Sequence, residues 1–490
     1  MHGGSGGHDA RSRTSWLIEM TSLEKRAPAR PVVCIQGIGF VGSSMAIAVA
    51  SARNADGSPR YDVVAVDLDT PPGRERVAAL NAGRLCFENA DEKLSASHAA
   101  ALRRGNLTAT TDPAAYARAS VVVVDVNLDV DLAGNPPSVD LAPLKRAVGD
   151  LADRVRPGTL LLVETTVPPG ACSRVLAPLI GERLAARGLG PDAILLAHSY
   201  ERVMPGVAYL DSIVNFWRVY AGHTAAAAAA CEAFLGSVID TGRFPLTRLE
   251  STVASELGKV LENSYRAATI AFVEEWSRFA ERVGVDIYPV IDEIRIRPTH
   301  GNLRQPGFGV GGYCLTKDPL LGGVSARQLF GLPELAFPFS ELAVSINRRM
   351  PLEALRLVRE CCGGSLRGRR ILLLGISYRS DVGDTRHAPS ETFVRQAREE
   401  GASVAGFDPL VSRWAELGEE LPRSLPAPGD FDAVVFASAH PQFTSLDIGA
   451  WLGSSRPFLV DANRVLAPAQ LEQVRRLRLP FRSIGRGIAA

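Results

Sequence analysis

A glycine-rich run that leads into a cysteine is the segment of this sequence best suited to covalent chemistry. Residues 307–313 read Gly-Phe-Gly-Val-Gly-Gly-Tyr, Cys314 follows directly, and Asp318 comes four residues later. We expect Cys314 at the start of a helix, where the positive end of the helix dipole and a nearby cation favour the thiolate. Asp318 is then predicted to share one helical face with the sulfur. Most cysteines are buried and unreactive, but the glycines and the carboxylate favour a reactive thiol here.

A lysine and an asparagine form a second polar pair, one helical turn apart. Lys259 and Asn263 fall within residues 251–283, which contain no proline and carry apolar residues at helical spacing. This pattern predicts one long helix or a slightly broken pair of helices. The apolar neighbours Leu257 and Val260 indicate that Lys259 is partly buried. Taken alone, a helical lysine is ordinarily a solvated surface charge.

A glycine fingerprint near the N-terminus predicts dinucleotide binding. The predicted strand at 32–36 runs into Gly-Ile-Gly-Phe-Val-Gly, a helical pattern follows, and Asp67 ends the next strand, where the adenosine ribose would lie. The alternative is a glycine-rich turn that merely packs well. The carboxylate of Asp67 would repel a 2′-phosphate and so favours NAD, although Arg74 and Arg76 could also contact a cofactor. The residues predicted to bind NAD here are Gly37, Ile38, Gly39, Phe40, Val41, Gly42 and Asp67.

The elements that must position these residues form two α/β patterns around a helical stretch. Short apolar runs predict buried parallel strands at 32–36, 63–67, 121–126, 160–164 and 194–197. Helices are predicted at 251–283, 338–361 and near 390–400, and a second set of strands at 371–374, 403–407, 433–437 and 458–460. The predicted fold is α/β, with two Rossmann-like doubly wound domains joined by a central helical domain with a long helix. The expected divisions are a disordered tail at 1–30 and domains at 31–244, 245–362 and 363–490.

Length and composition exclude several classes of protein. A chain of 490 residues is too long for one hydrophobic core. A formal net charge of +1 gives no general attraction to nucleic acid or a membrane surface, so an anionic ligand would need a local group of cations. The apolar runs are far shorter than the roughly 20 residues of a membrane span, and no signal peptide is visible. Seven cysteines without metal-ligand spacing indicate free thiols in a reducing cytoplasm and no metal site.

In their order and spacing, these motifs resemble those of the UDP-glucose/GDP-mannose dehydrogenase family. The resemblance implies NAD as cofactor, a UDP-sugar as substrate, a four-electron oxidation that uses two NAD in sequence, and a central helix that builds the interface of a homodimer or higher homo-oligomer. It assigns the first Rossmann domain to NAD and the second to the UDP-sugar. The motifs that carry it are Gly37–Gly42, Glu164–Gly170 (Glu-Thr-Thr-Val-Pro-Pro-Gly), Glu201–Gly206 (Glu-Arg-Val-Met-Pro-Gly), Glu256–Lys259 with Asn263, Pro306–Pro319, Gly383–Arg386 and Asn463–Arg464.

The resemblance also assigns roles residue by residue. It makes Cys314 the nucleophile that attacks the intermediate aldehyde, giving a thiohemiacetal and then a thioester that water hydrolyses. It makes Lys259 the cation that stabilises oxyanions, with Asn263 as its hydrogen-bonding partner. Asp318 matches a carboxylate that helps activate water, and Glu201 one implicated in acid/base work on the thioester. The remaining implied sites are Arg76, Glu164 and Lys317 for the cofactor and Gly311, Arg297, Arg379 and Arg464 for the substrate.

Some positions depart from the family pattern. The family usually has a Thr-Pro pair after the predicted strand at 121–126, where this sequence has Leu128-Asp129, so a threonine expected near catalytic water or cofactor is missing. Three further departures are interpreted as tuning substrate choice. His440 fits a family segment and is interpreted as structural or as lining the domain. The three are Tyr200 for the usual proline, Tyr313 for the common His or Ser, and Arg379-Ser380 where Lys-rich pairs occur.

Three functions stay open on the sequence. The main hypothesis is an active UDP-sugar 6-dehydrogenase whose sugar is glucose, N-acetylglucosamine or N-acetylmannosamine; the run at 306–312 leans toward the N-acetylhexosamines, and GDP-mannose is less favoured. The missing Thr-Pro pair motivates a second hypothesis, a nucleotide-sugar-binding protein with weakened catalysis. The third is a two-electron hydroxyacid dehydrogenase, which also has a Rossmann domain and a helical Lys–Asn pair. That hypothesis gives no role to Cys314 or to the second α/β domain.

Overall fold

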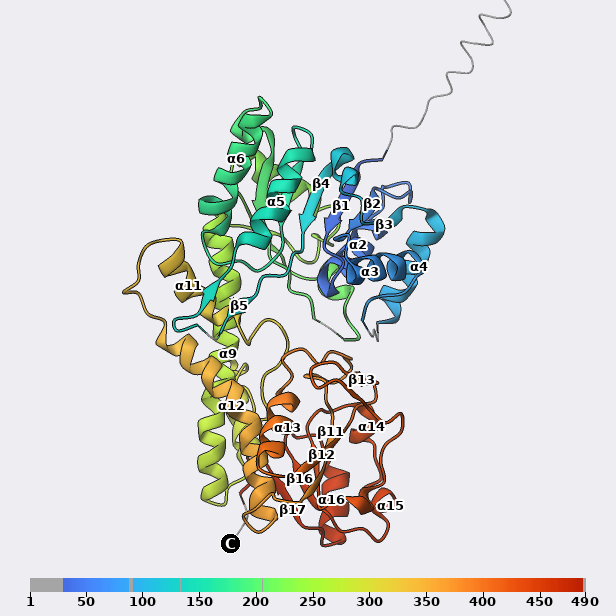
Figure 1. Ribbon diagram of the computed structural model, residues 1–490, viewed down its shortest axis with the longest axis vertical. Helices are drawn as coiled ribbons and strands as arrows, with labels where there is room; N and C mark the ends of the chain where they lie inside the picture. The colour runs from blue at the N-terminus through green and yellow to red at the C-terminus, as the bar shows by residue number, and fades with distance from the viewer. Residues whose placement is uncertain (1–29, 88–90, 133, 205, 488–490) are drawn as a thin grey trace, which may run out of the picture.

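A long helix joins two β-sheets in the computed structural model of the chain (Figure 1). The structure describes residues 30–87, 91–132, 134–204 and 206–487. Apart from Arg30, the predicted tail at 1–30 lies outside the described residues, as does Pro205 of the Glu201–Gly206 motif. Figure 1 shows the first sheet at the top, the second at the lower right and the central helices along the left side.

The first sheet contains the five strands predicted for this half of the chain and three more. Strand β1 lies between β2 and β4, so successive connections leave it on opposite sides. This arrangement makes the switch point at which doubly wound sheets bind ligands, at the carboxyl ends of the strands. In sheet order the strands are β10 (Thr247–Arg248), β9 (Val219–Gly222), β8 (Leu195–His198), β7 (Leu160–Val163), β4 (Ala119–Val124), β1 (Val32–Gln36), β2 (Asp62–Val66) and β3 (Leu107–Thr110).

Continuous apolar strands are buried here because helices cover both faces of the sheet. Val123 faces one hydrophobic core and its neighbours Val122 and Val124 the other, as expected for strand alternation. The prediction of parallel strands is confirmed for β1, β2, β4, β7 and β8 but does not extend to β9, which runs antiparallel to β8. The helices of this domain are α2 (Phe40–Ser51), α3 (Pro71–Asn81), α4 (Glu92–Arg104), α5 (Ala142–Arg154), α6 (Ala177–Ala186), α7 (Asp211–Val214) and α8 (Ala225–Leu235).

The central region is built on α9 (Thr252–Arg282), which is one unbroken helix of 31 residues. The Ser251 side chain caps it by accepting a hydrogen bond from the amide of Ala254. Helix α12 (Pro338–Cys361) has the bounds predicted from the sequence and packs along α9. Two shorter helices complete the region, α10 (Ile287–Ile296) and α11 (Leu321–Gln328).

The second sheet has five parallel strands, of which four were predicted. Counted along the chain within this sheet, the first strand again lies between the second and the third, which creates a second switch point. In sheet order the strands are β12 (Ser403–Phe407), β11 (Arg370–Leu374), β15 (Ala433–Phe436), β16 (Phe458–Asp461) and β17 (Phe481–Ser483). The helices around it are α13 (Pro389–Glu399), α14 (Pro441–Thr444), α15 (Ile448–Leu452) and α16 (Pro468–Arg476).

A short hairpin, β5 (Val130–Asp131) and β6 (Ser138–Val139), extends from the first sheet to the central helices. The amide of Val139 donates to Gln328 on α11 at 3.3 Å. The hairpin thus ties the first domain to the segment that follows Cys314. A second pair of short strands, β13 (Arg413–Trp414) and β14 (Glu419–Glu420), belongs to the third domain. Among the described residues no helix combines the length and apolar character needed to cross a membrane.

Candidate active site

The glycine turn after β1 has the geometry of a dinucleotide-binding loop. Gly37 has φ +97°, and its amide donates to the Val66 carbonyl at 2.8 Å. A Cβ atom on Gly42 would lie 1.9 Å from the Gly37 carbonyl oxygen, so only glycine fits. A Cβ on Gly39 would meet no protein atom within 4 Å, which leaves space in front of α2 for a pyrophosphate.

Asp67 lies at the carboxyl end of β2, where the sequence predicted a ribose-binding carboxylate. It accepts a hydrogen bond from the amide of Ile38 at 3.1 Å and forms a two-point pair with Arg76, at 2.8 and 3.0 Å. The guanidinium of Arg76 is therefore neutralised by Asp67. This pairing opposes the use of Arg76 for a 2′-phosphate and supports the preference for NAD.

Cys314 lies in a turn rather than at the start of a helix, which corrects the prediction. Its carbonyl accepts hydrogen bonds from the amides of Lys317 and Asp318, at 3.2 and 2.9 Å. Helical structure begins only at Asp318, in a short 3-10 helix (Asp318–Leu320). The first helical residue comes four positions after Cys314. The positive end of a helix dipole therefore does not lie next to the sulfur.

The predicted resting thiolate is also wrong. Cys314 is an exposed residue, but the surrounding protein desolvates its sulfur and raises the pKa of the thiol to about 12. Asp318 and Glu201 raise this pKa, whereas Lys259 and Lys317 lower it. Two carboxylates thus offset two ammonium groups, and no helix dipole adds to the cations. The resting sulfur is a thiol, and its activation needs a proton acceptor.

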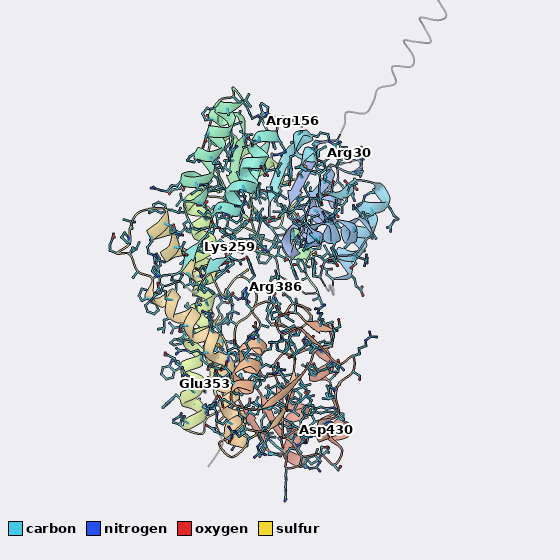
Figure 2. All side chains as sticks on the ribbon, in the orientation of Figure 1. Arg30, Arg156, Lys259, Glu353, Arg386 and Asp430 are labelled. Atoms are coloured by element: carbon cyan, nitrogen blue, oxygen red, sulfur yellow. The ribbon has the colours of Figure 1, made fainter. Side chains whose placement is uncertain are left out.

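Lys259 is buried in the site, more completely than the partial burial that the sequence indicated. Its ammonium donates to the backbone carbonyl of Glu201 at 2.8 Å and to the Glu201 carboxylate at 3.2 Å. Burial acts to lower the pKa of Lys259, but the charge and hydrogen bond of Glu201 and the charge of Asp318 act to raise it, and the pKa is raised overall. Lys259 therefore stays charged beside the sulfur. Figure 2 shows it where the first domain meets the central helix.

Asp318 is buried and fully paired. Asn263 donates to one of its oxygens at 2.8 Å, and Lys317 donates to the other at 2.8 Å. Asn263 thus donates to Asp318 and not to Lys259, the partner that the resemblance implied. Lys259 and Asn263 lie one turn apart on α9, and the asparagine side chain reaches the loop that carries Asp318. Lys317, predicted as a cofactor residue, holds the same carboxylate in place.

Glu164, another predicted cofactor residue, is buried at the carboxyl end of β7. Its carboxylate contacts the guanidinium of Arg218, which also donates to the Ser199 hydroxyl at 3.1 Å. Asp125 follows β4 directly and lies under the glycine loop. Desolvation and the charge of Glu201 raise the pKa of Asp125 to about 8, while Arg218 acts to lower it. Neither Asp125 nor Arg218 carried a signal in the sequence.

The glycines before Cys314 are explained by packing against the third domain. A Cβ on Gly311 would lie 2.4 Å from the Tyr378 Cβ, and one on Gly312 would lie 2.9 Å from the ring of Tyr378. A Cβ on Gly307 would lie 2.3 Å from the side chain of Asn463. The resemblance implied that Gly311 contacts the substrate. The structure shows that Tyr378 and Asn463 of the third domain approach these glycines closely.

Arg266 lies near Cys314 and near two further arginines, Arg304 and Arg379, of which only Arg379 was predicted. Arg266 follows Lys259 and Asn263 on one face of α9, at positions i, i+4 and i+7. Burial and the positive charges of Arg304 and Arg379 lower the pKa of Arg266, while Cys314 acts in the opposite direction. The Nε of Arg304 is buried and has no hydrogen-bond partner among the described residues. The i+7 spacing was the available signal for Arg266.

The other predicted substrate arginines differ in their surroundings. Arg464 lies over the ring of Tyr288, 4.8 Å from its centroid, and donates to Gln305 and Asp292 at 3.3 Å each. It therefore joins the third domain to α10 and to the glycine-rich segment. Arg297 is exposed after the last residue of α10. Among the described residues, no hydrogen bond or ion pair links Arg297 to the Cys314 group.

Glu256 is a buried carboxylate that sequence reasoning left without a role. It accepts hydrogen bonds from the amides of Gly170 and Cys172 at 2.6 and 2.8 Å. Burial raises the pKa of Glu256 to about 7, although these hydrogen bonds act to lower it. Glu256 lies one turn before Lys259, so it docks the catalytic face of α9 on the loop after Glu164.

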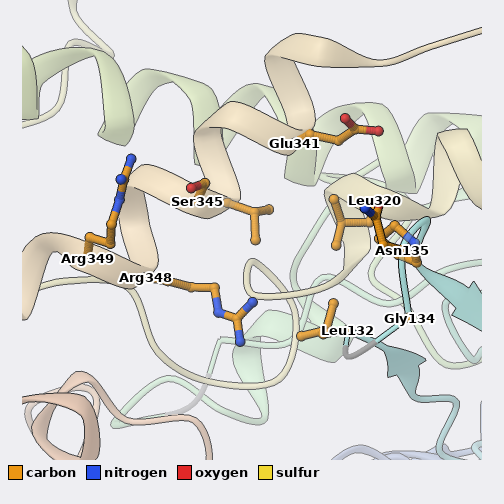
Figure 3. Close-up of a pocket in the computed structure, with 10 residues that line it drawn as sticks. Leu132, Gly134, Asn135, Leu320, Glu341, Ser345, Arg348 and Arg349 are labelled. Carbon is orange, nitrogen blue, oxygen red and sulfur yellow. The ribbon is translucent and has the colours of Figure 1, made fainter.

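A cavity of about 620 Å³ lies between residues 132–137 and α12, apart from these groups (Figure 3). None of the predicted site residues is among the described residues that line it. Its lining is Leu132, Gly134, Asn135, Pro137, Leu320, Glu341, Val344, Ser345, Arg348 and Arg349. Only Leu320 belongs to the segment that carries Asp318, so we assign the chemistry to the group around Cys314.

Comparison with known proteins gives matches along most of the chain. Three domain profiles of the UDP-glucose/GDP-mannose dehydrogenase family match in succession. The NAD-binding domain matches residues 32–235, the central domain 253–348 and the UDP-binding domain 372–468.

Individual relatives span nearly the same length. The UDP-N-acetyl-D-mannosamine dehydrogenase of Pyrococcus horikoshii is 29% identical over 461 residues, which cover 93% of this chain and 99% of the relative. The UDP-N-acetyl-D-glucosamine 6-dehydrogenase of Pseudomonas aeruginosa is 25% identical over 420 residues, 84% of this chain and 92% of the relative. The solved structure of the UDP-D-ManNAc dehydrogenase from Pyrococcus horikoshii has a TM-score of 0.78 at 27% identity and covers 94% of this chain and 100% of that one.

Proposed function

Because the chain belongs to the UDP-glucose/GDP-mannose dehydrogenase family, and is thereby an NAD-dependent nucleotide-sugar dehydrogenase, we propose that it oxidises the C6 alcohol of a UDP-linked N-acetylhexosamine to a carboxylate. The observation that carries the proposal is that Lys259 of α9 meets Cys314 and Asp318, which lie four residues apart in one loop. The choice of an N-acetylhexosamine follows the relatives, whose names specify UDP-N-acetyl-D-mannosamine and UDP-N-acetyl-D-glucosamine.

The cofactor site fits NAD. The open space in front of Gly39 and the amides at the start of α2 suit the pyrophosphate. Asp67, which holds Arg76, suits the hydroxyls of the adenosine ribose. When bound, NAD supplies a hydride acceptor, and two NAD molecules are reduced for each sugar. The roles of Glu164 and Lys317 toward the cofactor stay part of this proposal.

The substrate site fits a diphosphate. Arg266, Arg304 and Arg379 bring three positive charges together beside the nucleophile, in a chain whose net charge is only +1. The unpartnered buried Nε of Arg304 would gain a partner from a phosphate oxygen. Arg464, Arg297 and the backbone of Gly311 complete the proposed substrate residues. Because Arg266 lies near Cys314, a diphosphate held by these arginines would direct the attached sugar toward the sulfur.

The covalent step begins from the thiol. The first hydride loss and the loss of the alcohol proton leave an aldehyde at C6. The Cys314 sulfur then bonds to the aldehyde carbon as the C=O double bond opens, and the thiol proton passes to Glu201, whose charge also acts on the sulfur. The product is the oxyanion of a thiohemiacetal beside Lys259, and loss of its hydride leaves a thioester; Glu201 returns the proton to the sulfur when the C–S bond breaks.

Lys259 and the two carboxylates serve the remaining steps. The fixed ammonium of Lys259 stabilises the negative charge that develops on the substrate oxygen in both oxidations. Asp318 then takes a proton from the water that attacks the thioester, and Glu201 takes part in the proton transfers as the tetrahedral intermediate collapses. The C–S bond breaks, the uronic acid leaves and the thiol re-forms.

A panel of nucleotide sugars with NAD tests the proposal. UDP-N-acetylmannosamine, UDP-N-acetylglucosamine, UDP-glucose and GDP-mannose are each incubated with the protein, and NADH and acid are quantified. We expect two NADH for each acid formed and the highest kcat/KM with a UDP-N-acetylhexosamine. Tight binding of a UDP-sugar without NADH would support the weakened-binder hypothesis. One NADH for each sugar, without acid, would support a two-electron dehydrogenase.

We also propose that the protein is a homodimer built on α9, working in the cytoplasm. One face of α9 exposes a long row of apolar side chains at helical spacing. A straight stripe along one helix is complementary to a second copy of itself about a two-fold axis. All seven cysteines are unpaired, which suits a reducing compartment. The stripe consists of Leu257, Leu261, Tyr265, Phe272, Trp276, Phe279 and Val283.

A further inference from the structure

The residue before the nucleophile contacts all three parts of the molecule. The Tyr313 hydroxyl donates to the carboxylate of Asp129, which lies between β4 and β5 in the first domain. The Lys317 ammonium, from the central loop, lies 4.5 Å from the centroid of the Tyr313 ring. Arg386 of the third domain approaches the same ring at 5.7 Å.

Arg386 extends these contacts to the cofactor loop. Its carbonyl accepts a hydrogen bond from the amide of Gly312 at 3.2 Å, so the backbone next to Tyr313 is fixed as well. Its guanidinium lies 4.2 Å from the centroid of the Phe40 ring, at the first residue of α2. Asp384 holds that guanidinium with two hydrogen bonds, at 3.0 and 2.8 Å. Figure 2 shows Arg386 between the two sheets.

Asp129 and Tyr313 both lie at the departures from the family pattern noted in the sequence, and the structure joins them to each other. Leu128, which stands where a threonine is usual, is buried in the core of the first domain and offers no hydroxyl. Asp129 instead reaches the tyrosine. Their contact is a direct polar bond between the loop after β4 and the residue attached to Cys314.

We propose that Tyr313 and Asp129 form a positioning pair that fixes the Cys314 loop against the first domain, so that the sulfur captures the aldehyde before it leaves. The inference rests on the proposed function. The first hydride transfer does not need the sulfur, whereas capture of the aldehyde and the second transfer do. A loop shifted by about 1 Å lowers the rate of such a step by up to about 100-fold. Loss of the pair therefore lowers the rate of acid formation more than the rate at which the first NADH forms.

The test uses the full-length variants Tyr313→Phe and Asp129→Ala, the double variant and wild type. We expect each single variant to lower the kcat for acid formation about ten-fold, as loss of a hydrogen bond to a charged group does, with the KM for UDP-sugar changed less than about two-fold. The ratio of NADH to acid rises above two, and free aldehyde is trapped by added hydroxylamine. The double variant resembles either single variant, because one interaction is removed in all three. Asp129→Asn, which keeps an acceptor oxygen, retains an intermediate rate.

A matched control is Tyr61→Phe, which removes a tyrosine hydroxyl bonded to Ser237 at 2.7 Å in the core of the first domain. This variant should still form two NADH for each acid. The proposal is overturned if the single variants release no aldehyde, or if their effects multiply in the double variant. The rate at which iodoacetamide labels Cys314, followed by peptide mass spectrometry, tests whether the pair positions the sulfur and does not require sugar oxidation. A changed labelling rate in both variants and not in Tyr61→Phe supports the pair even where no sugar is oxidised, and an unchanged rate in both overturns it.

Discussion

Replacing Lys259 with methionine removes the ammonium that lies beside the nucleophile while keeping a side chain of similar length. In the structure this group bonds both the backbone carbonyl and the carboxylate of Glu201, at 2.8 and 3.2 Å. The variant therefore makes two changes. Developing oxyanions lose their stabilising charge, and Glu201 loses its ion-pair partner.

The two effects have different sizes. Loss of one preorganised oxyanion-stabilising group lowers kcat about 10²- to 10³-fold, or about 3–4 kcal/mol. Breaking a fully buried ion pair costs about 3–5 kcal/mol of stability. The Glu201 side chain is 13% exposed and keeps its hydrogen bond from the Val203 amide, so we expect a smaller loss of about 2 kcal/mol.

The double variant Lys259→Met/Glu201→Gln separates rate from stability. It removes both charges, so we expect its urea-unfolding midpoint, followed by circular dichroism, to return most of the way to that of wild type. Its rate of NADH formation should stay at least 100-fold below wild type. Lys259→Met activity within about ten-fold of wild type, or a rate that recovers together with stability, would refute the role given to this lysine.

Three further changes test other parts of the account. Asp318→Asn removes a charge that raises the pKa of Cys314, so iodoacetamide should label Cys314 faster at a given pH while acid formation falls; slower labelling would contradict the assigned sign. Glu256 has a folded-state pKa of about 7 against an ordinary 4.5. Its contribution to the free energy of unfolding is therefore complete below pH 4.5 and is lost as the pH rises through 7. Wild type should therefore lose up to roughly 3 kcal/mol relative to Glu256→Gln between about pH 5 and 8 in urea unfolding, and a pH-independent difference would speak against it. Trp276→Glu on the exposed stripe of α9 should yield monomers in sedimentation velocity, whereas an unchanged dimer would place the interface elsewhere.

The parts of the fold that could be predicted are those with a strong local pattern. Helix α12 and strands β1 and β12 have the predicted bounds, because amphipathic spacing and short, mostly apolar runs mark them. Strand β3 was missed since its residues alternate between buried and exposed and include two threonines. Strand β17 is three residues long, and the direction of β9 depends on its partner rather than on its own residues.

The site divides in the same way. The pairing of Lys259 with Asn263 on one helix face follows from spacing, and Arg266 continues that face. The environment of Cys314 depends on Glu201 and Lys259, which approach through the fold, so the dipole argument from local sequence failed. Glu256 is satisfied by amides 86 and 84 residues away, which no local pattern could indicate. The glycines before Cys314 leave room for the close approach of Tyr378 and Asn463, two residues of the third domain that no local pattern could identify.

The covalent link to Cys314 is tested most directly by mass spectrometry of the quenched reaction. UDP-N-acetylhexosamine and NAD are mixed with Asp318→Asn, in which thioester hydrolysis is slowed, and the peptide that contains Cys314 is analysed. The account predicts a sugar-nucleotide adduct on that sulfur, two NADH for each modified site, and no acid from Cys314→Ala. Undiminished acid formation by Cys314→Ala would contradict it.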